Sequence, residues 1–194
     1  MSRLILASAS PRRRELVRAI GLDFDVIPSR LEESFESAED PGACAERLAR
    51  MKAEAVAQKL EVADGRIVLG ADTIVVADSD ILGKPRSADE AQAMLTRLSG
   101  RAHDVITGVV FASPGVRRIL AARDVSRVYF RALSPQEIAA YVASGEPLDK
   151  AGAYAVQGSG ARLLERIEGS YTNVMGLPVG LVLRLLREWE KEKG

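Results

Sequence analysis

The chain has 194 residues, of which 47% are hydrophobic, so it can bury a substantial core within a single domain, residues 1–194. Its 27 basic residues balance 27 acidic ones and only 5% of residues are aromatic, which argues against a nucleic-acid-binding surface. One cysteine and one histidine exclude an internal disulfide and any common zinc site. No apolar run reaches the roughly 18 residues of a membrane span and no secretory leader is recognisable, so we expect a cytoplasmic protein.

The N-terminal segment predicts a strand, a helix and a second strand. Leu4–Leu6 is apolar enough for a short buried strand, and Ser10 and Pro11 suit the N-cap and first position of a helix. Gly21 ends this helix, and Phe24–Pro28 follows as another strand. This succession indicates an α/β fold.

Three arginines, Arg12–Arg14, occupy the first turn of that helix. A helix N-terminus is electropositive and disfavours cations, so an anion is expected there. Free backbone amides, serine hydroxyls and guanidinium groups together form a phosphate site. We therefore predict that Ser8, Ser10, Arg12 and Arg13 face phosphate, whereas the third arginine points to solvent or pairs with the glutamate after it.

An acidic loop and a long helix come next. Glu33 lies in the loop, where solvation is the usual explanation and a metal or substrate role is the less favoured one. Asp40 and Pro41 start a helix that we expect to end near Leu60. Its apolar stripe belongs to the core, with Lys52 beside it.

Val68–Val76 is an apolar, β-branched run that predicts a buried strand with one aspartate, Asp72, at its centre. An ionised carboxylate in such a place is costly unless it is hydrogen-bonded or holds a cation. One interpretation is that Thr73 or nearby backbone amides satisfy it. The other is a catalytic base or metal ligand that lines a cleft. This stretch alone leaves the two evenly balanced.

A hairpin and a helix follow the buried run. Asp78–Asp80 turns the chain back into Ile81–Leu82, after which a glycine and a proline present Lys84 on an exposed backbone. Ser87–Glu90 reads as a capping box for a helix through Leu98.

Two long strands are expected from His103 to Ala112 and from Arg117 to Arg131, with the lone histidine in a structural role. Ser134–Glu137 is a second capping box, for a helix that closes at Gly145.

The last part of the chain alternates loops with regular elements. Glu146–Gly160 is rich in glycine and small residues, which allow a ligand to approach the backbone. We expect a strand over Arg162–Ile167, a loop over Gly169–Asn173 and a helix over about Pro178–Glu190.

Four separated segments, in this order and spacing, resemble the Maf family of nucleoside triphosphate pyrophosphatases across nearly the whole chain. They are Ser8–Arg13, Gly70–Thr73 with Gly83–Pro85, Leu98–Gly100 with His103 and Thr107–Gly108, and Asp149–Tyr154 with Gln157 and Gly158. The glutamine in the last segment resembles the subgroup that hydrolyses dTTP and UTP. The resemblance implies an elongated mixed α/β fold with flanking helices, related to inosine triphosphatases, with a nucleotide cleft between two lobes. It also implies a divalent cation and a homodimer.

The resemblance assigns roles to individual residues. It makes Asp72 the proton acceptor and places Arg12, Thr73 and Gln157 at positions that set base specificity. Other polar positions of the family's cleft match Glu33, Lys52 and Lys84. We expect Mg²⁺ or Mn²⁺ at Asp72 and Glu33, and phosphate contacts from Ser8, Ser10, Arg13, Lys52, Lys84 and Lys150.

The expected reaction is attack of water on the α-phosphorus of the nucleotide, with Asp72 as general base and pyrophosphate as the leaving group. The Gln157 amide offers a donor and an acceptor that match O4 and N3–H of uracil and thymine, whereas cytosine presents the opposite polarity. Modified pyrimidine nucleotides are further candidate substrates. Two alternatives are a non-catalytic, nucleotide-binding regulator of cell division and a phosphatase that releases orthophosphate.

Overall fold

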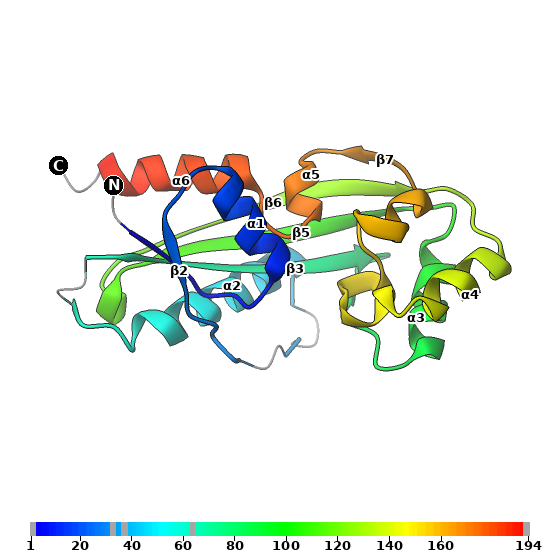
Figure 1. The fold of residues 1–194 in the computed structure, drawn as a ribbon, viewed down its shortest axis with the longest axis horizontal. Helices are drawn as coiled ribbons and strands as arrows, with labels where there is room; N and C mark the ends of the chain where they lie inside the picture. Colours follow the sequence, from blue (N-terminus) through cyan, green and yellow to red (C-terminus); the bar gives the residue numbers. More distant parts are fainter. Residues whose placement is uncertain (1–2, 32–33, 36–38, 63–64, 192–194) are drawn as a thin grey trace. The chain divides into compact units, whose positions relative to one another are not determined.

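The computed structural model describes residues 3–31, 34–35, 39–62 and 65–191 (Figure 1). The chain divides into two compact units. Unit 1 comprises Met1–Asp72, Thr107–Asp124 and Gly176–Gly194, and unit 2 comprises Thr73–Ile106 and Val125–Met175. Three long strands each contribute residues to both units.

Within the described residues, seven strands form one mixed sheet in the order β2, β1, β3, β5, β6, β7, with β4 paired to β3. β1 runs parallel to β2 and β3, whereas β4 is antiparallel to β3 and β7 to β6. The strands are β1 Leu4–Leu6, β2 Phe24–Val26, β3 Ile67–Ala77, β4 Asp80–Leu82, β5 Ala102–Ala112, β6 Ile119–Phe130 and β7 Leu164–Glu168.

Helices flank the strands, so the predicted α/β class and mixed sheet are confirmed. In unit 1, α2 covers one face of the sheet and α1 and α6 cover the other, and in unit 2 α3 packs beside α4 (Figure 1). The α-helices are α1 Pro11–Ala19, α2 Pro41–Ala57, α3 Ala88–Leu98, α4 Pro135–Ala143, α5 Tyr171–Val174 and α6 Val179–Lys191. The 3-10 helices are η2 Pro114–Val116, η3 Glu146–Asp149, η4 Ala151–Ala153 and η5 Gly158–Leu163.

The core of unit 1 lies between α2 and the strands. Its fully buried side chains come from β1, α2, β3 and β5 and include Ile5, Ala49, Ala53, Val68 and Val110. Small residues dominate the facing surface of α2, so this helix lies very close to the sheet.

Two glycines make that close approach. A Cβ on Gly70 would stand 2.3 Å from the carbonyl oxygen of Ala49, and a Cβ on Gly108 would stand 2.3 Å from that of Ala45. Any side chain at either position would push α2 away from β3 or β5. The glycine two residues before Asp72 therefore serves helix packing.

The core of unit 2 contains an aromatic cluster around His103, which is only 2% exposed. His103 Nε2 lies 2.8 Å from the Tyr154 hydroxyl, and the histidine ring makes edge contacts with the rings of Tyr154 and Phe130. Burial lowers the pKa of His103 to about 4. The geometry supports the predicted structural role of this histidine.

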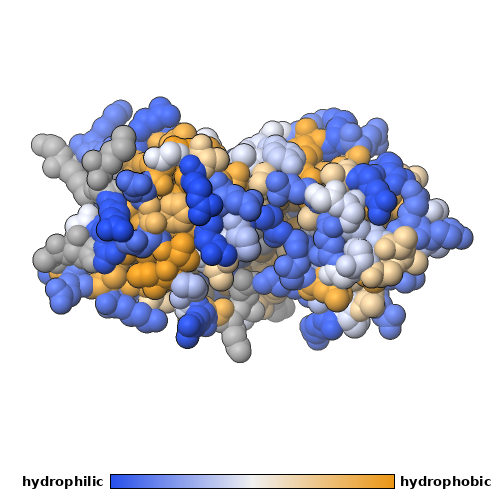
Figure 2. Space-filling view, viewed as in Figure 1, coloured by the Kyte–Doolittle hydropathy of each residue, from blue (hydrophilic) through white to orange (hydrophobic). Residues whose placement is uncertain are grey.

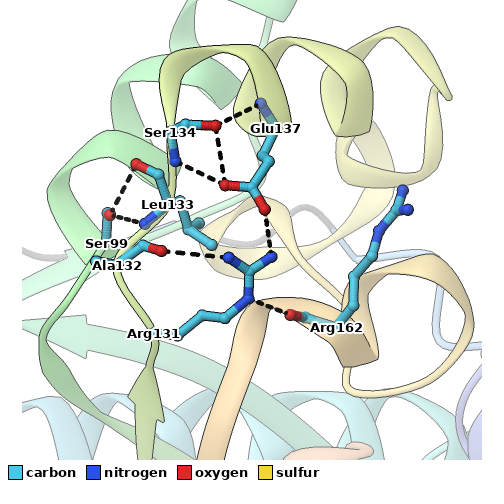
Figure 3. A network of polar contacts seen from close by, with 7 residues as sticks. All are labelled: Ser99, Arg131, Ala132, Leu133, Ser134, Glu137 and Arg162. Carbon is cyan, nitrogen blue, oxygen red and sulfur yellow. Dashed lines mark hydrogen bonds and ion pairs between the residues drawn. The ribbon is translucent and has the colours of Figure 1, made fainter.

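Figure 3 shows how α4 begins. The Ser134 hydroxyl accepts from the Glu137 amide at 3.3 Å, and Glu137 Oε2 accepts from the Ser134 amide at 2.8 Å, so the predicted capping box is confirmed. Arg131 donates to the same carboxylate. The Arg131 guanidinium and the Ser134 hydrogen bonds lower the pKa of Glu137 to about 2.

Some predicted boundaries and caps differ from the structure. α2 ends at Ala57, not near Leu60, because hydrogen bonds of the tighter 3-10 type close its last turn. The Ser87 hydroxyl accepts from the Glu90 amide and caps α3. The Glu90 carboxylate accepts from the Arg86 amide and not from the Ser87 amide, so only one of the two bonds of the predicted capping box forms. The expected loop over Gly169–Asn173 contains the start of α5, which Ser170 caps.

Hydrophilic residues cover much of the face shown in Figure 2, and apolar residues gather around β2 in unit 1. Val26 of β2 is one of the large apolar side chains that are exposed. Among the described residues, no helix combines the length and apolar character that a membrane crossing requires.

Candidate functional site

The segment after β1 lies at the carboxyl end of the parallel β1–β3 pair. Leu6 is paired with Leu69, and the Ala7 amide donates to the Leu69 carbonyl at 2.8 Å. The sheet therefore carries residues 8–13 and the following part of β3, which holds Asp72, to the same end of unit 1.

Ser10 caps α1 as predicted, with its hydroxyl accepting from the Arg13 amide at 3.4 Å. The Ser8 hydroxyl accepts from the Ser10 amide at 3.3 Å and from Arg13 Nη1 at 3.2 Å. Arg13 also donates through Nε to the Gly176 carbonyl at 2.8 Å. These bonds join Ser8, Ser10 and Arg13 into one cluster and tie α1 to the segment before α6.

The three arginines of α1 have different environments. Arg13 is buried, whereas Arg12 is half-buried and makes no hydrogen bond or ion pair with any residue in the described ranges. Arg14 is half-buried and donates to the carbonyl of Ala9 at 3.4 Å, in a contact that stays exposed to solvent, as one of its two predicted roles requires. α1 has no acidic residue in its first turn, which keeps this end electropositive.

Asp72 and Lys52 form a buried ion pair between β3 and α2. Their exposed fractions are only 3% and 8%. The carboxylate of Asp72 therefore faces an ammonium group from a helix 20 residues upstream. Such a pair compensates much of the cost of burying each charge, and loss of one partner would leave the other uncompensated.

Among the described residues, Asp72 is the predicted metal ligand, and one carboxylate suffices only for a divalent cation that takes its other ligands from a substrate. No group of three or more histidine, cysteine, aspartate or glutamate side chains gathers anywhere in the described part of the chain. Glu33, predicted to bind metal with Asp72, lies outside the described residues. Mg²⁺ is commonly held by one or two carboxylates together with substrate phosphates, and Asp72 supplies one such carboxylate.

Unit 2 holds the remaining predicted residues. Thr73 is half-buried on β3, Lys84 is exposed after β4, and Lys150 is paired with Asp149. The segments that carry the two lysines are joined, because the Gly152 amide donates to the Gly83 carbonyl at 3.0 Å.

Gln157 is exposed and stands at the N-cap of η5. The segment after it is hydrogen-bonded to Glu146, a residue that the sequence analysis placed in the loop without a role. Glu146 accepts from the Ser159 amide at 3.2 Å and from the Gly160 amide at 3.1 Å. No local sequence pattern predicts these hydrogen bonds, because Ser159 and Gly160 lie 13 and 14 residues from Glu146 and share no helix or strand with it.

Comparison with known proteins gives consistent matches along the chain. The family described as "Maf-like protein" matches residues 3–189. A dTTP/UTP pyrophosphatase of Moorella thermoacetica is 54% identical, with 96% of this chain and 94% of that one covered. The dTTP/UTP pyrophosphatase of Geobacter metallireducens is 50% identical, with 96% of this chain and 95% of that one covered. The one of Syntrophomonas wolfei is 49% identical, with 93% of this chain and 94% of that one covered.

A solved structure of lower similarity is that of the Staphylococcus aureus Ham1 protein. It is 18% identical, covers 96% of this chain and 99% of its own, and has a TM-score of 0.47. At this level of similarity it adds nothing to the fold described above.

Proposed function

The chain belongs to the Maf-like protein family, and we infer that it is a nucleoside triphosphate pyrophosphatase that acts on dTTP and UTP. Its products are the nucleoside monophosphate and pyrophosphate. The structural observation that supports this function is the buried carboxylate of Asp72. It is paired with Lys52 at the end of unit 1 that also holds the arginine-rich start of α1.

A triphosphate brings several negative charges, so its site needs fixed cations and hydrogen-bond donors. The start of α1 offers amides, serine hydroxyls and the half-buried guanidinium of Arg12. We assign phosphate binding to this segment and to the lysines, namely Ser8, Ser10, Arg13, Lys52, Lys84 and Lys150. Bonds to Ser8 and to the Gly176 carbonyl hold the Arg13 guanidinium beside the start of α1.

Asp72 is the proposed proton acceptor. Lys52 stabilises the ionised carboxylate in a buried setting, and an ionised carboxylate can take a proton from water. In the reaction, a water oxygen bonds to the α-phosphorus while the bond from that phosphorus to the oxygen bridging the α- and β-phosphates breaks. The water proton goes to Asp72, and pyrophosphate leaves.

Asp72, with Glu33, would hold the Mg²⁺ or Mn²⁺ that we propose as cofactor. When bound, this cation offsets the negative charge that develops on the pyrophosphate. We propose a nucleoside triphosphate as the partner of this site and a second copy of the chain as a partner in a homodimer.

Arg12, Thr73 and Gln157 are the proposed specificity residues. The exposed amide of Gln157 is available to pair with O4 and N3–H of uracil or thymine. If the Gln157 amide is held in this orientation, cytosine leaves a donor facing a donor and an acceptor facing an acceptor, which costs about 1–3 kcal/mol for each unpaired group once buried. The site therefore favours UTP and dTTP over CTP.

Product analysis tests the function. The purified protein is incubated with UTP, dTTP, CTP, ATP or GTP and Mg²⁺ or Mn²⁺ in ¹⁸O-labelled water. We expect pyrophosphate and a monophosphate that carries the label, since attack at the α-phosphorus places the water oxygen there. Asp72→Asn should lower the rate by roughly 10²–10⁴-fold.

The matched control is Asp78→Asn, at an aspartate that pairs with Arg101 next to the β3–β4 turn. This variant should keep the activity of the unmodified protein. Release of orthophosphate would favour a phosphatase, and nucleotide binding without turnover would favour a non-catalytic regulator. Either result would contradict the proposed reaction.

A further inference from the structure

The backbone around Gln157 is held by two side chains from another part of unit 2. C-terminal to Gln157, the amides of Ser159 and Gly160 donate to the two carboxylate oxygens of Glu146 at 3.2 and 3.1 Å. The Ser159 hydroxyl donates to the same carboxylate. These donors lie within two and three residues of Gln157, so Glu146 fixes the chain immediately after it.

Tyr141 holds the chain before Gln157. Its hydroxyl accepts from the Ala155 amide at 3.2 Å and donates to Glu146 Oε1 at 3.0 Å. The ring is fully buried on α4, so the hydroxyl is anchored to the core of unit 2. Gln157 is thus bracketed by contacts to one Glu146–Tyr141 pair.

The backbone at Gly158 and Gly160 lies in close contact with the side chains of Glu146 and Tyr141. A Cβ on Gly158, whose φ is +66°, would stand 3.2 Å from Glu146 Oε2. A Cβ on Gly160 would stand 2.6 Å from the Tyr141 hydroxyl and 2.3 Å from the Ala155 carbonyl oxygen. The two glycines allow the backbone to lie against the carboxylate and the phenol, and no other residue fits at Gly160 without displacing it.

The protonation states suit this arrangement. Burial raises the pKa of Glu146, but hydrogen bonds from Ser159, Gly160 and Tyr141 outweigh burial, and the pKa is lower than the ordinary 4.5. Burial raises the pKa of Tyr141. Near neutral pH, Glu146 is therefore an ionised acceptor and Tyr141 a protonated donor.

The other end of η5 is held separately (Figure 3). Arg131 Nε donates to the Arg162 carbonyl at 2.7 Å, and the Arg131 amide donates to the Leu163 carbonyl at 3.1 Å. The capping carboxylate of Glu137 holds the same guanidinium. Loss of Glu146 would consequently release the Gln157 end of the segment and leave the far end in place.

We propose that Glu146, together with Tyr141, is a positioning residue that fixes the Gln157 amide for reading the pyrimidine base. This inference rests on the proposed function, in which Gln157 distinguishes uracil and thymine from cytosine. Glu146 acts on the base only through the backbone it orders and is not itself a catalytic residue.

The main test compares kcat and KM for UTP and CTP in two isosteric variants. Glu146→Gln places an amide NH₂ group against backbone donors, and Tyr141→Phe keeps the buried ring but removes the hydroxyl. We expect kcat/KM for UTP to fall about tenfold in Glu146→Gln, mainly through KM, with a similar fall in the UTP-to-CTP ratio. The change in Tyr141→Phe should be smaller and in the same direction.

The matched controls come from another glutamate–tyrosine pair of unit 2. The Tyr129 hydroxyl donates to Glu168 Oε2 at 2.9 Å, and no hydrogen bond between described residues joins either side chain to residues 155–160. Glu168→Gln and Tyr129→Phe should leave both kcat/KM and the UTP-to-CTP ratio unchanged. Gln157→Glu is the reference variant, because it alters the reading group itself and should also lower the ratio.

A second measurement does not depend on turnover. Hydrogen–deuterium exchange of residues 155–160 should be faster in Glu146→Gln than in Glu168→Gln, because the amides of Ala155, Ser159 and Gly160 lose their acceptors or see them displaced. Unchanged exchange would overturn the positioning role whatever the activity. If Gln157→Glu changes the base ratio and Glu146→Gln does not, the inference is also overturned.

Absence of pyrophosphate release from UTP and dTTP in the unmodified protein would instead overturn the proposed function. The exchange measurement would then still decide whether Glu146 orders this segment. The two failures are therefore distinguishable.

Discussion

His103 shows how a single residue can set the pH response of the fold. The rings of Tyr154 and Phe130 lie against its ring, and burial lowers the pKa of His103 to about 4. The unfolded chain binds this proton with the ordinary pKa of 6.5, so between these values the unfolded state holds more protons than the folded state. Acidification through this range consequently favours unfolding.

We predict that the free energy of unfolding falls by about 2 kcal/mol between pH 7 and pH 5. The chain has one histidine, and carboxylates titrate mostly below pH 5. The change in the free energy of unfolding between pH 5 and pH 7 therefore reports the protonation of His103. Urea unfolding followed by Trp189 fluorescence at the two pH values measures the change. His103→Gln is the comparison and should show a much flatter profile, whereas an equally steep profile in this variant would contradict the prediction.

Asp72 and Lys52 illustrate the limit of reading one residue from its neighbours in sequence. The apolar run around Asp72 shows that its carboxylate needs a partner, but the ammonium that provides one comes from the middle of α2. Lys52 in turn lies beside an apolar stripe, which favours a core helix and gives no sign of an ion pair.

At the scale of elements, the contact between α2 and β3 places this ion pair. Gly70 lets the backbone of α2 lie against the strand, because a Cβ there would stand 2.3 Å from the Ala49 carbonyl oxygen and 2.8 Å from the Ala53 amide nitrogen. The obstacle is backbone, which cannot move as a flexible side chain could. Helix and strand would have to separate.

We predict that Gly70→Ala lowers the free energy of unfolding by about 1–3 kcal/mol, the usual cost of overpacking. Pyrophosphate release should fall as well, since a displaced α2 carries Lys52 away from Asp72. Urea unfolding and the product assay measure the two effects. Gly180→Ala is the matched control, because a Cβ at this α6 position meets nothing within 4 Å and alanine favours a helix. Equal effects of the two substitutions would contradict this account.

The sequence correctly predicts where a helix starts when the residues of its first turn carry the capping signal. Ser10 and Ser134 cap α1 and α4 as expected because a cap depends only on residues within the first turn. The sequence pattern does not predict the short helix α5, although Ser170 caps it, because a helix of four residues has no apolar periodicity. The segment over residues 146–160 was expected to be a loop and contains short 3-10 helices, which likewise have no periodic pattern.

For the molecule as a whole, substrate binding should be visible as stabilisation. A ligand that binds the folded chain alone raises the free energy of unfolding by about 2.7 kcal/mol at one hundred times its Kd. We predict that a UTP analogue with a methylene group between the α- and β-phosphates, which resists hydrolysis, raises the melting temperature in the presence of Mg²⁺. Chelation of the cation should remove most of this increase, because the triphosphate then repels Asp72.

Differential scanning fluorimetry measures this effect. The corresponding CTP analogue is the control and should raise the melting temperature less, since cytosine mismatches Gln157. An increase of the same size without a divalent cation would contradict the proposed role of the metal. The same increase with the CTP analogue would contradict base selection.

The α/β class, most element positions and the family follow from the sequence alone, because caps, apolar periodicity and the four motifs are carried by residues close together in the chain. The motifs also name the candidate site residues, whose roles stay predictions. The sequence does not predict the contacts that hold these residues in place. They are Lys52 with Asp72, Arg13 with the Gly176 carbonyl, and Glu146 with the segment after Gln157. Each joins residues 13 to 163 positions apart, so it exists only once the chain has folded.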